Sequence, residues 1–156
     1  MFASALAHGL RGLVAFSDPL PRRARDGTLV VPGHVGYIYQ ATNAVYTGRG
    51  PARRLLVLPD GRTLNARSLA KLRAGHTGHA YVTRLLVEHG ARPPTPREPV
   101  VTWLPGALAE AGVRAVAHPG CHRYAFPLGA TARARRSVAV RRTSAAYPKA
   151  VDASAA

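Results

Sequence analysis

Aromatic, amide and imidazole side chains crowd into residues 33–48 of a chain otherwise rich in arginine and alanine. They are His34, Tyr37, Tyr39, Gln40, Asn43 and Tyr46. An amide can read an adenine edge through a paired donor and acceptor, and an aromatic ring can stack on a base turned out of the duplex. These residue types therefore suit a pocket that holds a nucleobase. The alternative is a structural role, because a buried tyrosine is stable in a core once its hydroxyl has a partner.

A carboxylate and an imidazole near this segment could supply acid and base chemistry. Asp18 follows the apolar run 13–16 and precedes a proline, which places its carboxylate at a strand end where partial desolvation can raise the pKa. Its alternative role is an Asp-Pro turn that ends the strand. His34 has Gly33 and Gly36 beside it, so a ligand can approach its ring, which could act as acid, base or metal ligand. Its alternative role is a helix-start histidine bonded to the backbone.

A second group of candidate residues lies in the run from His118 to Tyr124. His118 and His122 are four residues apart, but the proline and glycine between them exclude the regular helix that a two-histidine zinc site uses. A turn could bring His118, Cys121 and His122 around a metal ion. Since no fourth ligand is evident, we assign no metal. His122, Arg123 and Tyr124 are instead candidates for contact with substrate or DNA.

Hydrophobic periodicity predicts the elements that position these residues. The apolar run 13–16 predicts a strand buried on both faces, yet no other long apolar strand pattern occurs before residue 55 to pair with it. The spacing between 36 and 43 fits a helix. Residues 21–26 fit a loop, and residues 28–31 fit a short extended piece.

The clearest local pattern is a hairpin over residues 54–64, with its turn at Pro59-Asp60-Gly61. Asn65 can cap a following helix over 66–73, which Gly75 would close. Further along, the sequence predicts a helix at 78–89 with Tyr81, Leu85 and Leu86 buried, a proline-rich connector at 92–99, a short helix around Trp103 and a strand at 123–128.

Length and composition favour one folded domain. A hydrophobic content of 47% over 156 residues supports a packed core. We place this domain at residues 1–130, followed by a basic, loosely ordered tail at 131–156. Cys121 is the only cysteine, which excludes an intramolecular disulfide and fits a reducing compartment. The apolar N-terminus is too interrupted for a membrane span or signal segment, so we expect a cytoplasmic protein with no membrane partner.

The charge of the chain indicates its partner. Lys and Arg number 22 against 7 Asp and Glu, which gives a net charge of +15 and a pI near 11.5. This range is typical of nucleic-acid-binding domains, so a polyanion is the expected partner. Arg67, Lys71 and Arg73 are the expected phosphate contacts on the helix after the hairpin. The alternatives are a solvated basic face and the arginine-rich composition of proteins from high-GC genomes.

Four ordered blocks resemble the Mom family of phage DNA-modification proteins over roughly residues 10–149. They are Phe16-Ser17-Asp18-Pro19, residues 33–48, His118-Pro119-Gly120-Cys121-His122-Arg123-Tyr124 and Tyr147-Pro148-Lys149. The resemblance implies an α/β (α+β) fold of the acetyltransferase-like (GNAT-like) type, with a mixed sheet flanked by helices. It also implies double-stranded DNA as the partner and transfer of a carbamoylmethyl-type group to the adenine exocyclic amine, which shields phage DNA from restriction. Cys121 stands where the family block H-P-G-N-H-R-Y has asparagine.

The same resemblance makes Asp18, in the F-x-D-P block, a candidate active-site residue. We assign catalysis to Asp18 together with His34, Tyr39 and Asn43. We assign substrate or DNA contact to Tyr37, Gln40, Tyr46, His122, Arg123 and Tyr124, beside the basic residues of 66–73. In this mechanism the adenine is flipped out, stacks on a tyrosine, is held by an amide and is activated by a carboxylate or a histidine.

The group donor stays open. The GNAT fold holds the pyrophosphate of acyl-CoA in a turn of the form R/Q-x-x-G-x-G/A, and this sequence has no such turn. Only about a dozen residues precede the first strand, so we expect an N-terminally shortened chain. An acyl-CoA-type donor follows from the fold analogy, and iron has been considered for the family. Two rival functions are a non-catalytic basic DNA-binding module and an acetyltransferase for a small amine, for which the net charge of +15 has no use.

Overall fold

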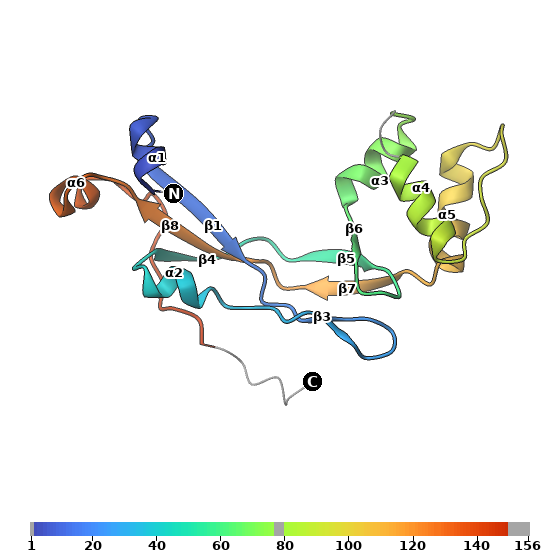
Figure 1. The fold of residues 1–156 in the computed structure, drawn as a ribbon, viewed down its shortest axis with the longest axis horizontal. Coiled ribbons are helices and arrows are strands. Elements are labelled where there is room, and N and C mark those ends of the chain that lie inside the picture. Colours follow the sequence, from blue (N-terminus) through green and yellow to red (C-terminus); the bar gives the residue numbers. More distant parts are fainter. Residues whose placement is uncertain (1, 77–79, 150–156) are drawn as a thin grey trace. The chain divides into compact units, whose positions relative to one another are not determined.

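The computed structural model describes residues 2–76 and 80–149, which fall into two compact units (Figure 1). Unit 1 comprises Met1–Leu20, Gly33–Ala52 and Pro119–Ala156, and unit 2 comprises Pro21–Pro32 and Arg53–His118. Both units draw on residues 1–130, which the sequence predicts as one domain. The fold class is mixed α/β, with small antiparallel sheets and short helices.

Unit 1 is built on a three-stranded antiparallel sheet. Its elements are α1 (Phe2–Ala7), β1 (Gly12–Ser17), α2 (Tyr37–Ala41), β4 (Val45–Arg49), β8 (His122–Pro127) and α6 (Ala132–Arg136). The strand order is β1-β8-β4. The central strand β8 alternates between buried and half-buried residues, so His122, Tyr124 and Phe126 share one buried face. Tyr124 and Phe126 form the core of this unit together with Ala44, Tyr46 and Leu128.

The strand predicted at 13–16 is present as β1, but the prediction that both of its faces are buried is wrong. All six residues of β1 pair with β8, from Gly12 with Pro127 to Ser17 with His122. Val14 is 59% exposed and Phe16 is 55% exposed, whereas the alternate residues face the core. An antiparallel sheet can leave one face uncovered, whereas the sequence pattern resembled a strand of a parallel sheet covered on both sides.

Unit 2 combines a second sheet with three helices. Its elements are β2 (Arg22–Arg23), β3 (Leu29–Val31), β5 (Arg53–Val57), β6 (Thr63–Leu64), α3 (Ala66–Arg73), α4 (Ala80–Glu88), α5 (Val100–Glu110) and β7 (Arg114–His118). The main sheet is antiparallel in the order β6-β5-β7, and β2 pairs with β3. Figure 1 shows α3, α4 and α5 gathered at one end of this sheet. Leu58, Leu86, Trp103 and Leu104 are the best-buried large residues of the core between them.

The hairpin and the helix after it are confirmed. Leu56 pairs with Leu64 across the hairpin, and the Asn65 side chain accepts a hydrogen bond from the Arg67 amide at 2.8 Å. The helix predicted at 78–89 is α4, although residues 77–79 lie outside the described part of the chain. The prediction that Tyr81 is buried is wrong, because Tyr81 is 44% exposed and Val82 packs in the core instead. The sequence also missed β4, β7 and the two-residue β2, which lies within the predicted loop 21–26.

The described part of the predicted tail is attached to unit 1. α6 follows Thr131, and beyond it the Ala145 amide donates to the Tyr46 carbonyl at 2.9 Å. The Tyr147 hydroxyl donates to the Ala44 carbonyl at 2.9 Å. These bonds anchor the segment up to residue 149 on the core, and the rest of the predicted tail, 150–156, lies outside the described residues. Among the described helices, none has the length and apolar character needed to cross a lipid bilayer.

Candidate functional site

A buried histidine and tyrosine form the polar centre of unit 1. His122, on β8, is 1% exposed, and its Nδ1 lies 2.9 Å from the hydroxyl of Tyr46 on β4. The other ring nitrogen, Nε2, is buried and has no hydrogen-bond partner among the described residues. A buried polar atom without a partner costs about 1–3 kcal/mol, and such atoms are uncommon in native structures. Packing alone therefore does not explain the position of the His122 ring.

The surroundings of His122 keep its imidazole neutral. Burial is the main cause that lowers the pKa of His122, and electrostatic interactions with Arg49 and His34 lower this pKa further. A neutral imidazole has one N–H donor and one acceptor nitrogen. Nδ1 is hydrogen-bonded to Tyr46 and uses either the donor or the acceptor role of the neutral ring. Nε2 has the other role, so it is either an acceptor with a free lone pair or an N–H donor without an acceptor among the described residues. The His122 ring could therefore donate or accept a proton at Nε2, while Nδ1 is hydrogen-bonded to the Tyr46 hydroxyl.

Tyr124 anchors the loop that carries His34. The Tyr124 hydroxyl donates to the Val35 carbonyl and accepts from Nε2 of Gln40 at 3.2 Å. Burial raises the pKa of the Tyr124 hydroxyl. Gly36 packs against the Tyr124 ring with a φ of 83°, and a Cβ there would lie 2.7 Å from a ring carbon. Only glycine fits both the left-handed backbone and this contact. The loop 33–36 is thereby fixed against the sheet.

Aromatic rings connect the exposed edge of this site to its buried end. The rings of His34 and Tyr39 have centroids 6.5 Å apart, and Tyr39 lies 5.3 Å from Tyr124. Tyr124 lies 5.3 Å from Tyr46, whose ring is 5.5 Å from His122. Separations of this size are typical of aromatic packing in cores. We call this row the aromatic series; it begins at the exposed His34 and ends at the buried His122.

Several predicted substrate contacts have structural partners instead. Nε2 of Gln40 donates to the carbonyl oxygens of Val35 and Pro148 and to the Tyr124 hydroxyl, at 3.2–3.3 Å. Arg123 donates from Nε and Nη2 to the side chain and carbonyl of Thr47, at 2.9 and 2.7 Å, and so joins β8 to β4. Tyr46, His122 and Tyr124 are each at most 8% exposed. In this conformation these residues hold the strands and the loop of unit 1 together, and each is buried or half-buried where a substrate contact would be exposed.

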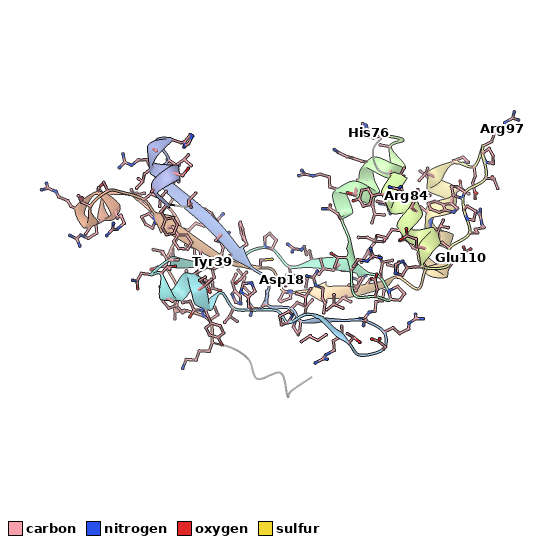
Figure 2. All side chains as sticks on the ribbon, viewed as in Figure 1. Asp18, Tyr39, His76, Arg84, Arg97 and Glu110 are labelled. Atoms are coloured by element: carbon pink, nitrogen blue, oxygen red, sulfur yellow. The ribbon has the colours of Figure 1, made fainter. Side chains whose placement is uncertain are left out.

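Asp18 has the structural role that the sequence left open. Its Oδ1 accepts the Leu20 amide at 3.0 Å, which is the turn expected of an Asp-Pro pair. Its carbonyl accepts the His34 amide at 2.8 Å, so Asp18 also positions the backbone of the histidine. Figure 2 labels Asp18 and Tyr39, both of which are half-buried. Asp18 thus acts on His34 through the backbone.

Tyr37 and Asn43 lie at the two ends of α2 and face outward. Tyr37 is 58% exposed. Asn43, just after the helix, is exposed and has a left-handed backbone with a φ of 57°, a conformation that asparagine adopts more readily than most residues. Neither residue belongs to the aromatic series, but both present their side chains on the surface of unit 1.

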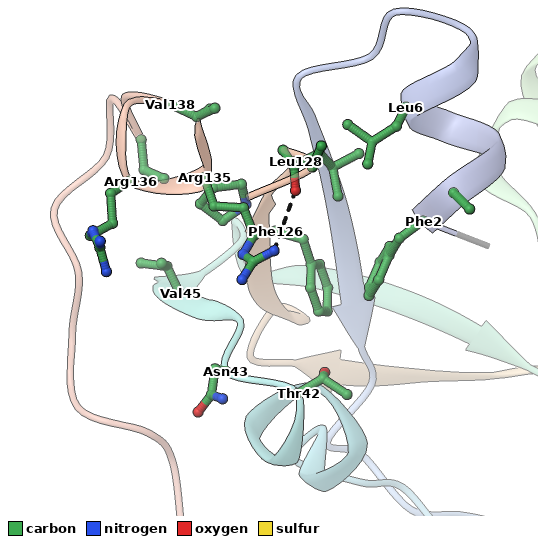
Figure 3. A pocket seen from close by; sticks show the side chains of 15 residues that line it. Phe2, Leu6, Thr42, Asn43, Val45, Phe126, Leu128, Arg135, Arg136 and Val138 are labelled. Carbon is green, nitrogen blue, oxygen red and sulfur yellow. Dashed lines mark hydrogen bonds between the residues drawn. The ribbon is translucent and has the colours of Figure 1, made fainter. Parts of the chain in front are cut away.

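A pocket of about 740 Å³ opens beside Asn43. Figure 3 shows Phe2 and Leu6 of α1 opposite Val45, with Phe126 and Leu128 at the end of β8 between them. The pocket is also lined by Arg135 and Arg136. Arg135 donates to the Gly129 carbonyl at 3.3 Å, which holds its guanidinium group near the pocket. The result is an apolar cavity with two cations, a combination that suits an anionic ligand with an apolar portion.

The remaining predicted site residues lie in unit 2. Arg67, Lys71 and Arg73 are exposed on α3. His118 is the last residue of β7 and belongs to unit 2, whereas Cys121 and His122 belong to unit 1.

Sequence reasoning missed three residues of the site. Ser17 is 1% exposed, and its hydroxyl lies 3.0 Å from the position of a Cβ on Gly36. Thr47 is buried, and its hydroxyl accepts a hydrogen bond from Nε of Arg123. Arg49 contributes to the low pKa of His122. Alternation along β1 places Ser17 on the same face as Leu13 and Ala15, so the sequence could have identified it as inward-facing. Thr47 directly follows the buried Tyr46, so strand alternation would not have identified it.

Comparison with known proteins gives no assignment for this chain. No protein-family model matches it, and neither the curated proteins nor the solved structures contain a match. The function therefore has to be argued from the residues of the site and from the charge of the chain.

Proposed function

We propose that this protein modifies DNA, with the exocyclic amine of adenine as the acceptor and unit 1 as the part that carries the chemistry. The observation that carries the proposal is a pair of imidazoles, exposed at His34 and buried and neutral at His122, joined by tyrosine rings in a chain with a net charge of +15. We also propose that the antiparallel sheet of unit 1 is part of a GNAT-like fold, as the resemblance to the Mom family implies.

The acceptor chemistry needs a base and a stacking surface. The exocyclic nitrogen of adenine is a weak nucleophile, so its proton must leave as the new nitrogen–carbon bond forms. His34 is exposed and is the imidazole of the aromatic series that a base from DNA can reach. In our proposal His34 accepts this proton, while the donor's leaving group departs with the bonding electrons of the bond that breaks. Tyr37 and Tyr39 offer ring faces for the flipped base.

The buried residues keep His34 in place. Asp18 binds the backbone of His34, and the contact between Gly36 and Tyr124 fixes the loop that follows it. Positioning of this kind contributes to rate because a base displaced by about 1 Å loses much of its effect. The hydrogen bond between Tyr46 and His122 joins β4 to β8, the strand that carries Tyr124.

The pocket beside Asn43 suits the group donor. Its apolar walls and the guanidinium groups of Arg135 and Arg136 fit an acyl-CoA-type donor, which has an apolar arm and phosphates. When bound, such a donor supplies the carbon that the adenine nitrogen attacks. Asn43 lines this pocket, so in our proposal its amide orients either the donor or the base.

Mass spectrometry of nucleosides tests the proposal. DNA from cells that express the protein should contain an adenosine derivative of increased mass, and the His34→Gln variant should abolish it. His76→Gln is the matched control, because His76 is an exposed histidine in unit 2 (Figure 2). Unmodified adenosine in DNA from cells with folded, abundant protein would overturn the proposal.

A second candidate function is a DNA-binding module without catalytic activity. It is favoured by the basic exposed face of α3, which needs no chemistry from unit 1. This function predicts DNA binding with a steep salt dependence and unmodified nucleosides.

A further inference from the structure

The exposed face of α3 has an unusually simple composition. Leu69 and Leu72 are buried at 2% and 8% exposure and attach the helix to the core of unit 2. The exposed residues of α3 and its C-terminal cap are only alanine, arginine and lysine: Ala66, Arg67, Ala70, Lys71, Arg73 and Ala74. Short alanine side chains let the helix backbone approach a partner closely, while the long cations reach beyond it. Such a face suits a polyanion that the helix can lie against.

The cations of this face are not neutralised by their own unit. Among the described residues, no ion pair involves Arg67, Lys71 or Arg73, and the first turn of α3 has no acidic residue. Other arginines of unit 2 differ in this respect. Arg62 is 2.5 Å from Asp60, and Arg92 is 2.5 Å from Glu98. The charge of α3 therefore remains available to a partner.

The helix is held rigidly in position. The Asn65 side chain caps its first turn, and the His76 amide donates to the Lys71 carbonyl at 3.0 Å after the last turn. On its inner side, the Tyr81 hydroxyl of α4 donates to Oγ of Ser68 at 2.7 Å. A helix fixed in this way loses little further backbone entropy when a partner binds.

We propose that α3 is a binding element for duplex DNA that contacts the phosphate backbone from the major groove. The proposal takes DNA as the partner, as the proposed function does, and adds the element of unit 2 that holds it. An α-helix with its side chains is about 10–12 Å across, and the major groove of B-DNA is about 12 Å wide, so a helix such as α3 can enter it. Contacts from arginine and lysine to phosphate position the protein without reading sequence, so the binding is largely independent of sequence.

The same face is unsuited to other anionic partners. A membrane-binding helix must insert its apolar side chains, and those of α3 are buried in the core. Protein interfaces depend on central aromatic or large apolar anchors, which the exposed residues of α3 lack. Double-stranded RNA has a deep, narrow major groove that does not admit a helix. Duplex DNA is the partner that matches both the charge and the shape of α3.

The test compares two double variants that each lose two positive charges. Arg67→Gln/Lys71→Gln removes cations from α3, and Arg62→Gln/Arg97→Gln removes exposed cations from elsewhere in unit 2. Figure 2 shows Arg97 on the loop before α5, pointing away from the ribbon. Fluorescence anisotropy with a labelled duplex of mixed sequence gives the affinity between roughly 50 and 200 mM salt. Circular dichroism melting confirms that both variants are folded.

We expect the salt dependence to separate the two variants. Each lost phosphate contact reduces the slope of log K against log salt by about 0.9, so the α3 variant should lose about 1.8. This corresponds to an affinity up to roughly 60-fold weaker at about 0.1 M salt, with the slope of the control unchanged. An equal slope in the two variants would overturn the proposal. Equal α3-dependent binding of an RNA duplex, or tighter binding to anionic phospholipid vesicles, would also overturn it.

The binding and nucleoside experiments together distinguish a failure of the α3 proposal from a failure of the catalytic proposal. If the α3 variant loses slope while the nucleosides of the wild-type experiment are unmodified, α3 binds DNA and the catalytic proposal is wrong. If adenosine is modified but α3 makes no difference to binding, the catalytic proposal stands and DNA is held by another surface.

Discussion

The hydrogen bond between Tyr46 and His122 gives a quantitative test of the polar centre of unit 1. Tyr46→Phe removes the hydroxyl that lies 2.9 Å from Nδ1, so both nitrogens of the buried His122 ring would then lack partners. Removing one partner of a buried hydrogen bond leaves the other group unsatisfied, which costs about 1–3 kcal/mol. The free energy of unfolding should therefore fall by about 1–3 kcal/mol.

A double-mutant cycle shows whether the two residues interact as the structure implies. His122→Leu removes both ring nitrogens, so the double variant has no orphaned imidazole and should be destabilised by about 1–2 kcal/mol less than the sum of the single variants. Urea denaturation followed by circular dichroism at pH 8 measures all four proteins. Tyr37→Phe is the control, because Tyr37 is 58% exposed and its loss should change stability by less than about 0.5 kcal/mol. Additive effects within about 0.3 kcal/mol would refute the coupling between the tyrosine and the histidine.

Three further predictions concern stability. Gly36→Ala should cost at least about 1–2 kcal/mol from the left-handed backbone alone, plus the contact with the Tyr124 ring, and thermal melting would show it; an unchanged melting temperature contradicts the close packing. Asn65→Ala should cost about 1 kcal/mol through loss of the bond to the Arg67 amide, whereas Asn65→Asp should retain most of the stability in the same urea titration. Because burial lowers the pKa of His122 from 6.5, its contribution to stability is present above pH 6.5 and is lost as the pH falls through the lowered value; His122→Gln should flatten this part of the pH profile, and an unaltered profile counts against it.

Local patterns predicted much of unit 2. The hairpin turn, the Asn65 cap and the positions of Leu69 and Leu72 depend on residues close together in the sequence, and the structure confirms them. The exposure of Tyr81 was not predictable in this way. Val82, one residue later, points into the core, and the choice between them depends on how α4 packs against α3 and α5.

Unit 1 was harder to predict because its sheet joins distant segments. β8 lies between β1 and β4, and Tyr124 pairs with Ala15 on one side and Tyr46 on the other. Without β4 in the prediction, the sequence could not show that the aromatic residues of 33–48 pack on β8. Residue types did indicate which side chains cluster there. Their roles as buried supports follow only from long-range pairing, which propensity and periodicity do not contain.

The burial of Trp103 makes its fluorescence a probe of the folding of unit 2. Trp103 is the only tryptophan of the chain, is 1% exposed, and donates from its indole nitrogen to the Arg92 carbonyl at 2.9 Å. Tryptophan emission therefore comes entirely from the core beneath α3, α4 and α5, and it will shift to longer wavelength when that core opens to water. Intrinsic fluorescence can thus follow the folding of the unit that carries α3 without any label, while tyrosine signals include unit 1.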